Sequence, residues 1–367
     1  MSSARVILPV DHLADVWPSA LRSPNLKLGA VLHPASVDHQ LTHTLTHLQK
    51  LSGTSFQLSA LFGPQHGFGG STQDNMIEWE GYRHPESGIP VHSLYGEHRQ
   101  PTSAMIDPLD ALLVDLMDVG SRYYTFIWTL FLCMKACQDQ QIPVLVCDRP
   151  NPINGIDIEG EPQDPNYLSF VGLHPIPIRH AKTIGELAVQ FQSEMFPDCE
   201  LHVLPMEGWE RQQWWDETGL PWVMPSPNMP TLDTAIVYPG MCLLEGTNLS
   251  EGRGTTRPFE IFGAPWIDAP LLASTLEDKR LPGVLFRELN FEPTFQKHAH
   301  QLCQGVQIHV TDRDGYEAVR TGLTILETMQ DIWPDQFAWN PPPYEYEHDK
   351  LPIEILLGRS IGQSLLP

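Results

Sequence analysis

Short runs of apolar residues recur along the first half of the chain, separated by polar or amphipathic stretches. The runs most typical of buried strands are Leu28–Leu32, Phe56–Phe62, Pro90–Leu94, Ala111–Asp115 and Pro143–Cys147. Each is apolar at nearly every position, as in strands that are covered on both faces of a sheet. Such strands alternating with helical segments predict an α/β fold with a mostly parallel sheet.

Helices are predicted between and after these strands. His39–Leu51 and Thr125–Gln140 follow strands, and a third helix is expected at Ile184–Met195. Thr183 and Glu186 stand at its start with the spacing of a capping box, in which each side chain bonds the other residue's backbone N–H. The first half therefore predicts strands and helices in regular alternation.

A proline-rich stretch suggests where the chain divides. LPWVMPSPNMP, from Leu220 to Pro230, predicts an extended connector, because proline removes the N–H group that a helix needs. A chain of 367 residues also exceeds what one hydrophobic core usually spans. We therefore expect a larger domain over residues 1–235 and a smaller α/β domain over 236–367, with a strand at Gly305–Thr311 and a helix at Tyr316–Ile332.

Composition narrows the class of protein. The formal net charge of −23 repels nucleic-acid phosphates, so nucleic acid is not an expected partner. No stretch approaches the length of a membrane-spanning helix, and the N-terminus lacks the pattern of a signal peptide. The six cysteines are scattered without a C-x-x-C pair, as in a reducing compartment. These features predict a cytoplasmic protein; they do not indicate its oligomeric state.

Polar side chains follow three of the predicted strands. Gln65 and His66 follow the strand Phe56–Phe62, and Asp115 and Asp118 stand at and after the end of Ala111–Asp115. The segment CDRPNP stands at the end of Pro143–Cys147. In parallel α/β sheets, ligands bind beyond the carboxyl ends of the strands. Three polar endings in one sheet therefore indicate a small-molecule site, to which these segments add Arg122, Tyr124, Arg149 and Asn151.

The segment GPQHGFGG, which carries Gln65 and His66, is rich in glycine but is not a phosphate loop. It lacks the G-x-G-x-x-G spacing of dinucleotide-binding proteins and the Lys-Ser/Thr ending of a P-loop. A nucleotide-dependent oxidoreductase is therefore not supported, and no cofactor is expected. Its glycines either let the backbone approach a ligand or form a plain turn after the strand.

The densest polar stretch is EGTNLSEGRGTTRPFE. It contains the candidate residues Glu245, Asn248, Glu251 and Arg253, which form either part of a site or an ion-pair network. Arginine forks bind carboxylates through two hydrogen bonds. Arg122, Arg149, Arg179 and Arg253 therefore suggest an anionic group on the ligand, or each pairs with an acidic neighbour.

Three histidines resemble a metal site without the rest of its pattern. His39, His43 and His47 recur every four residues, so the predicted helix would align them on one face. The glutamate of H-E-x-x-H is missing, and we expect a solvent-facing stripe and no metal. No serine stands in a G-x-S-x-G elbow either, so a serine hydrolase is not supported.

Taken together, the polar segments resemble those of the bacterial exo-β-N-acetylmuramidases, a glycoside hydrolase family formerly known only as a domain of unknown function. The resemblance extends from about Leu28 to near the C-terminus. It is carried by GPQHGFGG, DLMDVGSRYYTFIWTL, CDRPNPING, SFVGLHPIPIRH, TGLPWVMPSPNMPTLDTAIVYPG, LLEGTNLSEGRGTTRPFEIFGAPW and GVQIHVTDRD.

The resemblance implies a Rossmann-like N-terminal domain that carries most of the site, a smaller α/β domain, and a cleft between them. It implies release of a terminal N-acetylmuramic acid from peptidoglycan fragments, as in cell-wall recycling, with a small sugar or muropeptide as the ligand. The lactyl carboxylate of that sugar would suit the arginines. The matching motifs add His180 and Asn228 as substrate-binding candidates.

One departure from the family pattern concerns catalysis. Members proposed to be muramidases have glutamate in the motif where this chain has Gln65, and an amide does not transfer protons near neutral pH. Three interpretations remain open: another carboxylate supplies the acid, this branch of the family acts on a different sugar, or the protein binds sugar without cleaving it. The candidate acids are Asp118, Glu245 and Glu251, then Glu78 and Glu159, with His66 as a further proton-transfer group.

Two mechanisms remain open from the sequence. Most glycosidases need two carboxyl groups, but the carbonyl of a 2-acetamido sugar can itself act as the nucleophile. One acid would then suffice, and Gln65 could hold the acetamido group. The competing class is an altered or inactive member that binds an amino sugar or an anionic ligand. A buried carboxylate near Gln65 favours the enzyme, and ion-paired carboxylates alone favour binding.

Overall fold

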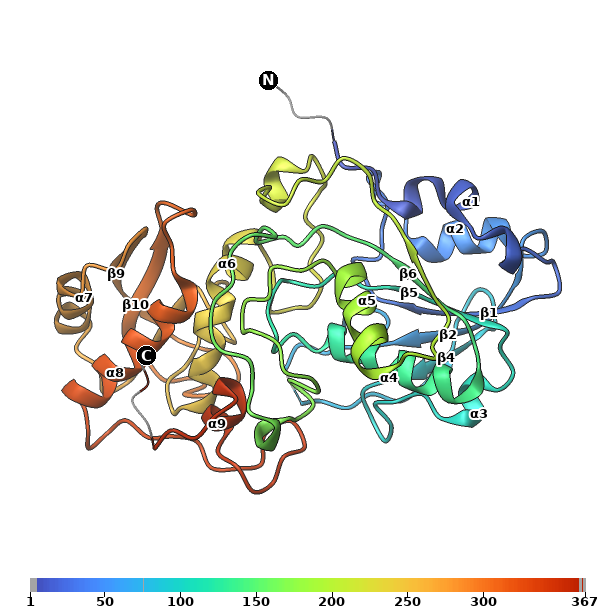
Figure 1. Cartoon of the computed structure of the whole chain (residues 1–367). Helices are drawn as coiled ribbons and strands as arrows, with labels where there is room; N and C mark the ends of the chain where they lie inside the picture. The colour runs from blue at the N-terminus through green and yellow to red at the C-terminus, as the bar shows by residue number, and fades with distance from the viewer. Residues whose placement is uncertain (1–4, 75, 363–364, 366–367) are drawn as a thin grey trace. The chain divides into compact units, whose positions relative to one another are not determined.

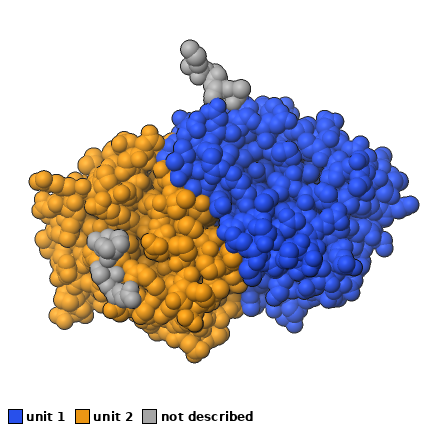
Figure 2. Space-filling model, viewed as in Figure 1, with its two compact units in different colours: residues 1–120, 124–156, 181–227 blue, residues 121–123, 157–180, 228–367 orange. Residues whose placement is uncertain are grey.

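The computed structural model describes residues 5–74, 76–362 and 365, which form two compact units (Figure 1). Unit 1 comprises residues up to Gly120, Tyr124–Ile156 and Ala181–Pro227. Unit 2 comprises Ser121–Tyr123, Asp157–His180 and the chain from Asn228 onwards (Figure 2). The sequence analysis predicted a single boundary after residue 235, whereas residues 121–123, 157–180 and 228–235 belong to unit 2.

Unit 1 is built on a sheet with seven strands among the described residues, in the order β3-β4-β2-β1-β5-β6-β7. The strands are β1 (Lys27–Leu32), β2 (Gln57–Gly63), β3 (Tyr82–Arg83), β4 (Pro90–Ser93), β5 (Ala111–Asp115), β6 (Val144–Cys147) and β7 (Leu201–Leu204). All neighbouring pairs are parallel except β3 with β4. The predicted mostly parallel α/β sheet is therefore confirmed.

The strand order reverses between β1 and β5. From β1 the chain proceeds outwards to β2 and β4, and from β5 it proceeds in the other direction to β6 and β7. This is the Rossmann-type order, in which the crevice outside the carboxyl ends of the two central strands is the usual place for a ligand. The topology thus directs attention to the residues that follow β1 and β5.

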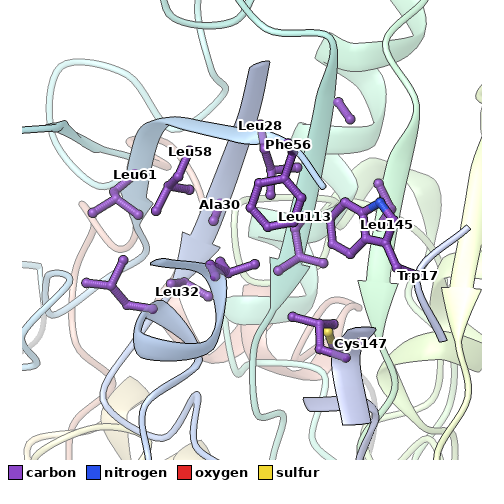
Figure 3. Close-up of a cluster of buried hydrophobic side chains, with 14 of the residues drawn as sticks. Trp17, Leu28, Ala30, Leu32, Phe56, Leu58, Leu61, Leu113, Leu145 and Cys147 are labelled. Carbon is purple, nitrogen blue, oxygen red and sulfur yellow. The ribbon is translucent and has the colours of Figure 1, made fainter. Parts of the chain in front are cut away.

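Helices pack on both faces of this sheet. They are α1 (Leu13–Val16), α2 (Thr44–Leu51), α3 (Ser103–Ile106), α4 (Phe126–Gln140) and α5 (Ile184–Met195). On one face, Trp17 and Leu48 pack against Leu28, Ala30 and Phe56 in an apolar cluster (Figure 3). Elsewhere in the unit, aromatic side chains join α4 to α5, with the Trp128 and Phe191 ring centroids 5.7 Å apart.

The start of α5 confirms the predicted capping box. Thr183 Oγ1 accepts a hydrogen bond from the Glu186 backbone N–H, and the Glu186 carboxylate accepts one from the Thr183 N–H. The prediction for the three histidines was wrong, because α2 begins only at Thr44. His43 caps that helix by accepting from Leu45 N–H, whereas His39 and His47 pair separately with Asp11 and Asp38.

Unit 2 contains a small antiparallel sheet in the order β8-β10-β9, covered by helices. Its elements are α6 (Leu232–Met241), β8 (Ile261–Ala264), α7 (Ala269–Asp278), β9 (Val284–Phe291), β10 (Cys303–Val310), α8 (Ala318–Ile332) and α9 (Pro352–Leu357). Both units contain short 3-10 helices, which are Pro9–His12, Ser19–Leu21 and Trp215–Glu217 in unit 1 and Pro165–Tyr167 and Cys242–Gly246 in unit 2. Among the described residues, no helix combines the length and apolar character needed to cross a membrane.

The helices α6 and α8 approach each other backbone to backbone. A Cβ atom added to Gly240 would lie 1.9 Å from the Ala318 carbonyl oxygen, and one added to Gly322 would lie 2.3 Å from the Gly240 oxygen. Only glycine fits at both positions, because any side chain would collide with the neighbouring helix. This close contact sets the spacing between α6 and α8 in unit 2.

Candidate functional site

The carboxyl ends of the parallel strands bring the polar segments of unit 1 to one edge of the sheet. His33 follows β1, Gln65 and His66 follow β2 after one proline, and Asp148 follows β6. The connection after β5 begins at Leu116 and leads into α4 at Phe126. The three polar strand endings predicted from the sequence therefore do meet at one edge.

Gln65 and His66 are nearly buried and hydrogen-bonded. Gln65 Oε1 accepts a hydrogen bond from Thr125 Oγ1 at 2.6 Å. His66 has a left-handed backbone with φ 70°, and its Nδ1 lies 2.8 Å from the Thr72 carbonyl oxygen. A carbonyl oxygen only accepts, so Nδ1 carries a proton and donates it to this hydrogen bond.

The loop that carries these residues folds back over the end of β2. A Cβ atom on Gly63 would lie 2.5 Å from the Phe68 backbone nitrogen, so this position requires glycine. Trp79 supports the loop by donating its indole N–H to the Pro64 carbonyl oxygen at 3.0 Å. Gly63 of GPQHGFGG thus serves a close backbone approach.

Asp118 lies in the buried connection between β5 and α4. Its side chain is 5% exposed, and Oδ2 accepts a hydrogen bond of 2.7 Å from the Gly120 N–H. Gly120 has φ +80°, and a Cβ there would lie 2.5 Å from Asn151 Oδ1. Asn151 donates to the Lys182 carbonyl oxygen at 3.0 Å, and its contacts therefore support the turn that holds Asp118.

At the end of β5, Asp115 forms a buried hydrogen-bonded cluster with Arg149 and Thr44. Asp115 accepts two hydrogen bonds from Arg149, at 2.5 Å from Nε and 2.9 Å from Nη2, and a third from Thr44 Oγ1. Burial alone would raise the pKa of the Asp115 carboxyl, but the charge and hydrogen bonds of Arg149 outweigh it and hold the pKa below its usual value. Arg149 was predicted to bind substrate; its contacts instead favour pairing with an acidic neighbour.

His33 completes this buried group. Its Nε2 accepts a hydrogen bond from the Met117 N–H at 2.9 Å, and its Nδ1 lies 3.3 Å from the Pro225 carbonyl oxygen. Burial, with the nearby Arg149 charge, lowers the pKa of His33 to about 3. The ring is therefore neutral at physiological pH and links the ends of β1 and β5 to the proline-rich segment.

In unit 2, Arg122 and Arg179 are buried, and their guanidinium groups bond to other parts of the chain. The Arg122 guanidinium donates to the carbonyl oxygens of Glu161, Ile176 and Leu356 at 2.9, 2.9 and 2.6 Å. Arg179 pairs with Glu159 at 2.9 Å and with Asp157 at 3.1 Å. These contacts favour structural roles for both arginines, and their predicted contact with substrate remains a prediction.

The polar stretch after α6 forms a buried network of charges in unit 2. Arg253 bonds Glu245 at 2.7 Å and lies 3.3 Å from Glu251, which Lys297 approaches to 2.8 Å. Tyr344 donates its hydroxyl to Glu245 at 2.6 Å. Burial would raise the pKa of Glu251, but Lys297 and Arg253 hold it below its usual value. The ion-pair alternative is thereby favoured over a catalytic acid at either glutamate.

The remaining predicted residues are buried, except for Asn248, which is half-buried. Tyr124 packs its ring against Phe126 in unit 1, with centroids 4.8 Å apart. Asn248 exchanges hydrogen bonds with Gln336 and Ala338 in unit 2, and His180 and Asn228 are buried in the same unit. Among the described residues, no group of three or more histidine, cysteine, aspartate or glutamate side chains is arranged to hold a metal ion.

The sequence analysis placed Asp148 in the polar segment CDRPNP but did not select it as a candidate acid, although its pKa is raised. Burial raises the pKa of Asp148, although Oδ1 accepts hydrogen bonds from the backbone N–H groups of Gly185 and Arg149. The side chain lines a cavity of about 570 Å³ together with Lys182 and Arg211. The sequence offered one signal for Asp148, which is its position directly after a buried apolar strand.

These features define a two-unit α/β protein whose polar residues gather at the carboxyl edge of a Rossmann-type sheet. Two family models match nearly the whole chain: exo-β-N-acetylmuramidase NamZ, N-terminal, over residues 28–233, and exo-β-N-acetylmuramidase NamZ, C-terminal, over residues 236–365. The chain belongs to this family, which confirms the resemblance inferred from its motifs.

Individual relatives agree with this assignment. The peptidoglycan β-N-acetylmuramidase NamZ of Bacillus subtilis (strain 168) is 47% identical over 330 residues, which span 90% of this chain and 78% of the relative. A crystal structure of a DUF1343 family protein from Bacteroides fragilis has a TM-score of 0.85 and 31% identity, covering 97% of this chain and 89% of that one. A second, from the same organism, has a TM-score of 0.73 and 27% identity, covering 98% and 90%.

Proposed function

We propose that this protein is an exo-acting glycoside hydrolase that releases terminal N-acetylmuramic acid from peptidoglycan fragments. The observation that carries the proposal is the 47% identity, over 90% of the chain, to a peptidoglycan β-N-acetylmuramidase. The gathering of Gln65, His66 and the segment containing Asp118 at one edge of the sheet supports it, because ligands bind there in such folds. All six cysteines are free thiols, which supports a cytoplasmic location.

The mechanism we propose uses the substrate's own acetamido carbonyl as the nucleophile. This oxygen attacks the anomeric carbon and forms a cyclic intermediate as the glycosidic bond breaks. Gln65 is the residue that we assign to the acetamido group: its Oε1 accepts from Thr125, and its NH₂ is the donor end of the amide. Water then attacks the anomeric carbon, gives one proton to the carboxylate left by the proton donor, and opens the ring so that the acetamide is restored.

Asp118 is the group we propose as proton donor to the leaving oxygen. It is a buried carboxylate in the connection that also carries Thr125, the partner of Gln65. Gly120 N–H fixes one of its oxygens, so the carboxyl is held in one orientation. The other candidates are less suitable, because Glu245, Glu251 and Glu159 form ion pairs with arginine and Glu78 is exposed.

One observation favours a second function, the binding of an amino sugar without cleavage. Gln65 replaces the glutamate of the family motif, and the glutamates of the polar stretch in unit 2 are ion-paired. A protein of this kind would keep the sugar-binding groups and lack the proton donor. The two functions differ in one measurable property, turnover.

The experiment is incubation of the purified full-length protein with a chromogenic β-N-acetylmuramide and, in parallel, with the matching β-N-acetylglucosaminide. We expect release from the muramide alone. No release from either substrate, with the muramide still raising the melting temperature, would refute the hydrolase and favour the binding protein.

A further inference from the structure

A cavity of about 400 Å³ opens beside the loop that carries Gln65 and His66. Its wall includes Pro34, which follows β1, and Phe68 and Gly69, which follow β2, so it lies at the same carboxyl edge of unit 1. The opposite wall is formed by α2 and by the turn that contains His84. This volume is in the range of small-ligand sites, and the mechanism above does not use it.

Phe68 offers a fixed aromatic surface in this cavity. The ring is half-buried, packs against the apolar cluster of unit 1 and also lines the cavity. Two histidine rings flank it, with centroids at 5.9 Å for His43 and 6.3 Å for His84. His43 cannot turn freely, since its Nε2 donates to the His33 carbonyl and its Nδ1 accepts from Leu45 N–H.

The backbone around Phe68 is held closely as well. A Cβ on Gly70 would lie 2.5 Å from Cγ of Pro34, so the loop sits directly on the end of β1. The turn at His84 is closed by two backbone hydrogen bonds of 2.8 Å, from His84 N–H to Ile89 and from Gly88 N–H to His84. Both walls are therefore formed before any ligand binds, which lowers the entropic cost of binding.

The polar groups of the cavity suit a neutral sugar ring. Thr46, Gln49, His84 and Glu86 supply hydroxyl, amide, imidazole and carboxylate groups along the wall. Among the described residues that line it, none is lysine or arginine, and Glu86 would repel an anionic ligand. Aromatic rings offer an apolar face for the C–H groups of a pyranose, while the polar wall groups bond its hydroxyls.

We infer that this cavity binds the neutral 2-acetamido pyranose on the reducing side of the cleaved bond, with Phe68 as its stacking surface. The inference rests on the proposed function, because only a substrate with a second sugar needs such a place. The exposed carboxylate of Glu86 disfavours N-acetylmuramic acid in this cavity, because that sugar carries a lactyl carboxylate of the same charge. Phe68 and His84 therefore contribute to the choice of the leaving sugar.

The test measures binding of methyl β-N-acetylglucosaminide to the full-length protein by saturation-transfer NMR, without turnover. Phe68→Leu keeps an apolar side chain against the core and removes the aromatic face, and His84→Ala removes one polar wall group. Tyr82→Ala is the control, because Tyr82 is an exposed aromatic residue two positions from His84 that does not line the cavity. We expect Kd to rise at least about tenfold in Phe68→Leu and severalfold in His84→Ala, with Tyr82→Ala unchanged.

Equal affinity in the wild type and Phe68→Leu, or no binding to the wild type, would overturn the inference. Release from the chromogenic muramide is measured on the same samples, so the two proposals fail separately. Turnover without glucosaminide binding would leave the hydrolase standing and refute the cavity assignment. Binding that depends on Phe68, without turnover, would support the sugar cavity and count against the hydrolase.

Discussion

Thr125 Oγ1 donates a hydrogen bond of 2.6 Å to Gln65 Oε1, and this contact identifies the oxygen end and the NH₂ end of the Gln65 amide. Because a hydroxyl donates to the oxygen, the NH₂ group is the end that offers donors. Gln65, which stands where the family motif has glutamate, therefore has a defined amide orientation. Two explanations for this glutamine can be tested: it acts as an N–H donor, or it is a weakened replacement for a catalytic acid.

Gln65→Glu should lower kcat on β-N-acetylmuramides by roughly tenfold or more, because the carboxylate keeps the Thr125 bond but loses the N–H donor. Thr125→Val is the matched variant: it leaves the amide in place, frees its orientation and should cause a smaller loss. Steady-state kinetics with melting temperatures as folding controls provide the measurement. An increase in kcat for Gln65→Glu would mean that glutamine is a weakened replacement for a catalytic acid.

Asp118→Asn should reduce kcat by about 10²–10⁴-fold, the usual contribution of a general acid. The asparagine oxygen can still accept from Gly120 N–H, so the turn should persist. Glu78→Gln, in an exposed position, should have little effect. Steady-state kinetics of the two variants are the measurement. A large loss in Glu78→Gln, with none in Asp118→Asn, would transfer the role to Glu78.

Arg149→Met should destabilise the protein by about 3–5 kcal/mol, because it leaves the Asp115 carboxylate buried without its partner. The control is Arg320→Met, which breaks an exposed ion pair with Glu317 and should cost less than about 1 kcal/mol. Urea unfolding monitored by fluorescence measures both. A small cost for Arg149→Met would show that its guanidinium is available for a ligand instead.

Stability should fall as the pH drops from 6.5 towards 3, partly because of His33. Its pKa is lowered from 6.5 in the unfolded chain to about 3 in the folded protein, so below 6.5 the unfolded state binds the additional proton. The contribution is fully present above pH 6.5 and is lost as the pH approaches 3. NMR titration of the His33 ring protons measures this directly. A midpoint near 6.5 would contradict the buried, neutral ring.

A second acid-dependent loss should follow at lower pH, from Glu251. Its pKa lies below the usual 4.5 in the folded protein, so its contribution is present above pH 4.5 and is lost below it. Lys297→Met should weaken this loss, because one of the two charges that lower the Glu251 pKa is removed. Urea unfolding curves at a series of pH values compare the two proteins, and identical pH dependence would exclude a role for Lys297.

The sequence predicted the elements whose local signals agree with their packing. The apolar run Ala111–Asp115 coincides with β5, and the capping box at Thr183 marks the first residue of α5. It did not predict α6, because Pro239 lies inside that helix and argues against helix locally. The close contact of Gly240 with α8 compensates for this, and such a contact depends on residues about eighty positions apart.

The positions of the polar residues in the fold were predicted better than the bonding partners of their side chains. Polar residues after β2, β5 and β6 do share one edge, because parallel strands end together. The partners of the arginines were not readable from the sequence. Arg122 stands four residues after Asp118, yet its guanidinium donates to carbonyl groups of residues 161, 176 and 356, which no local pattern relates to it.

The route of the chain limits how this protein can be divided. Residues 121–123 and 157–180 lie among the residues of unit 1 in sequence and belong to unit 2 in space. A fragment that begins near residue 236 would lack Arg122, whose hydrogen bond to Leu356 secures the end of α9. Separate expression of the two halves is therefore expected to yield an incomplete C-terminal piece.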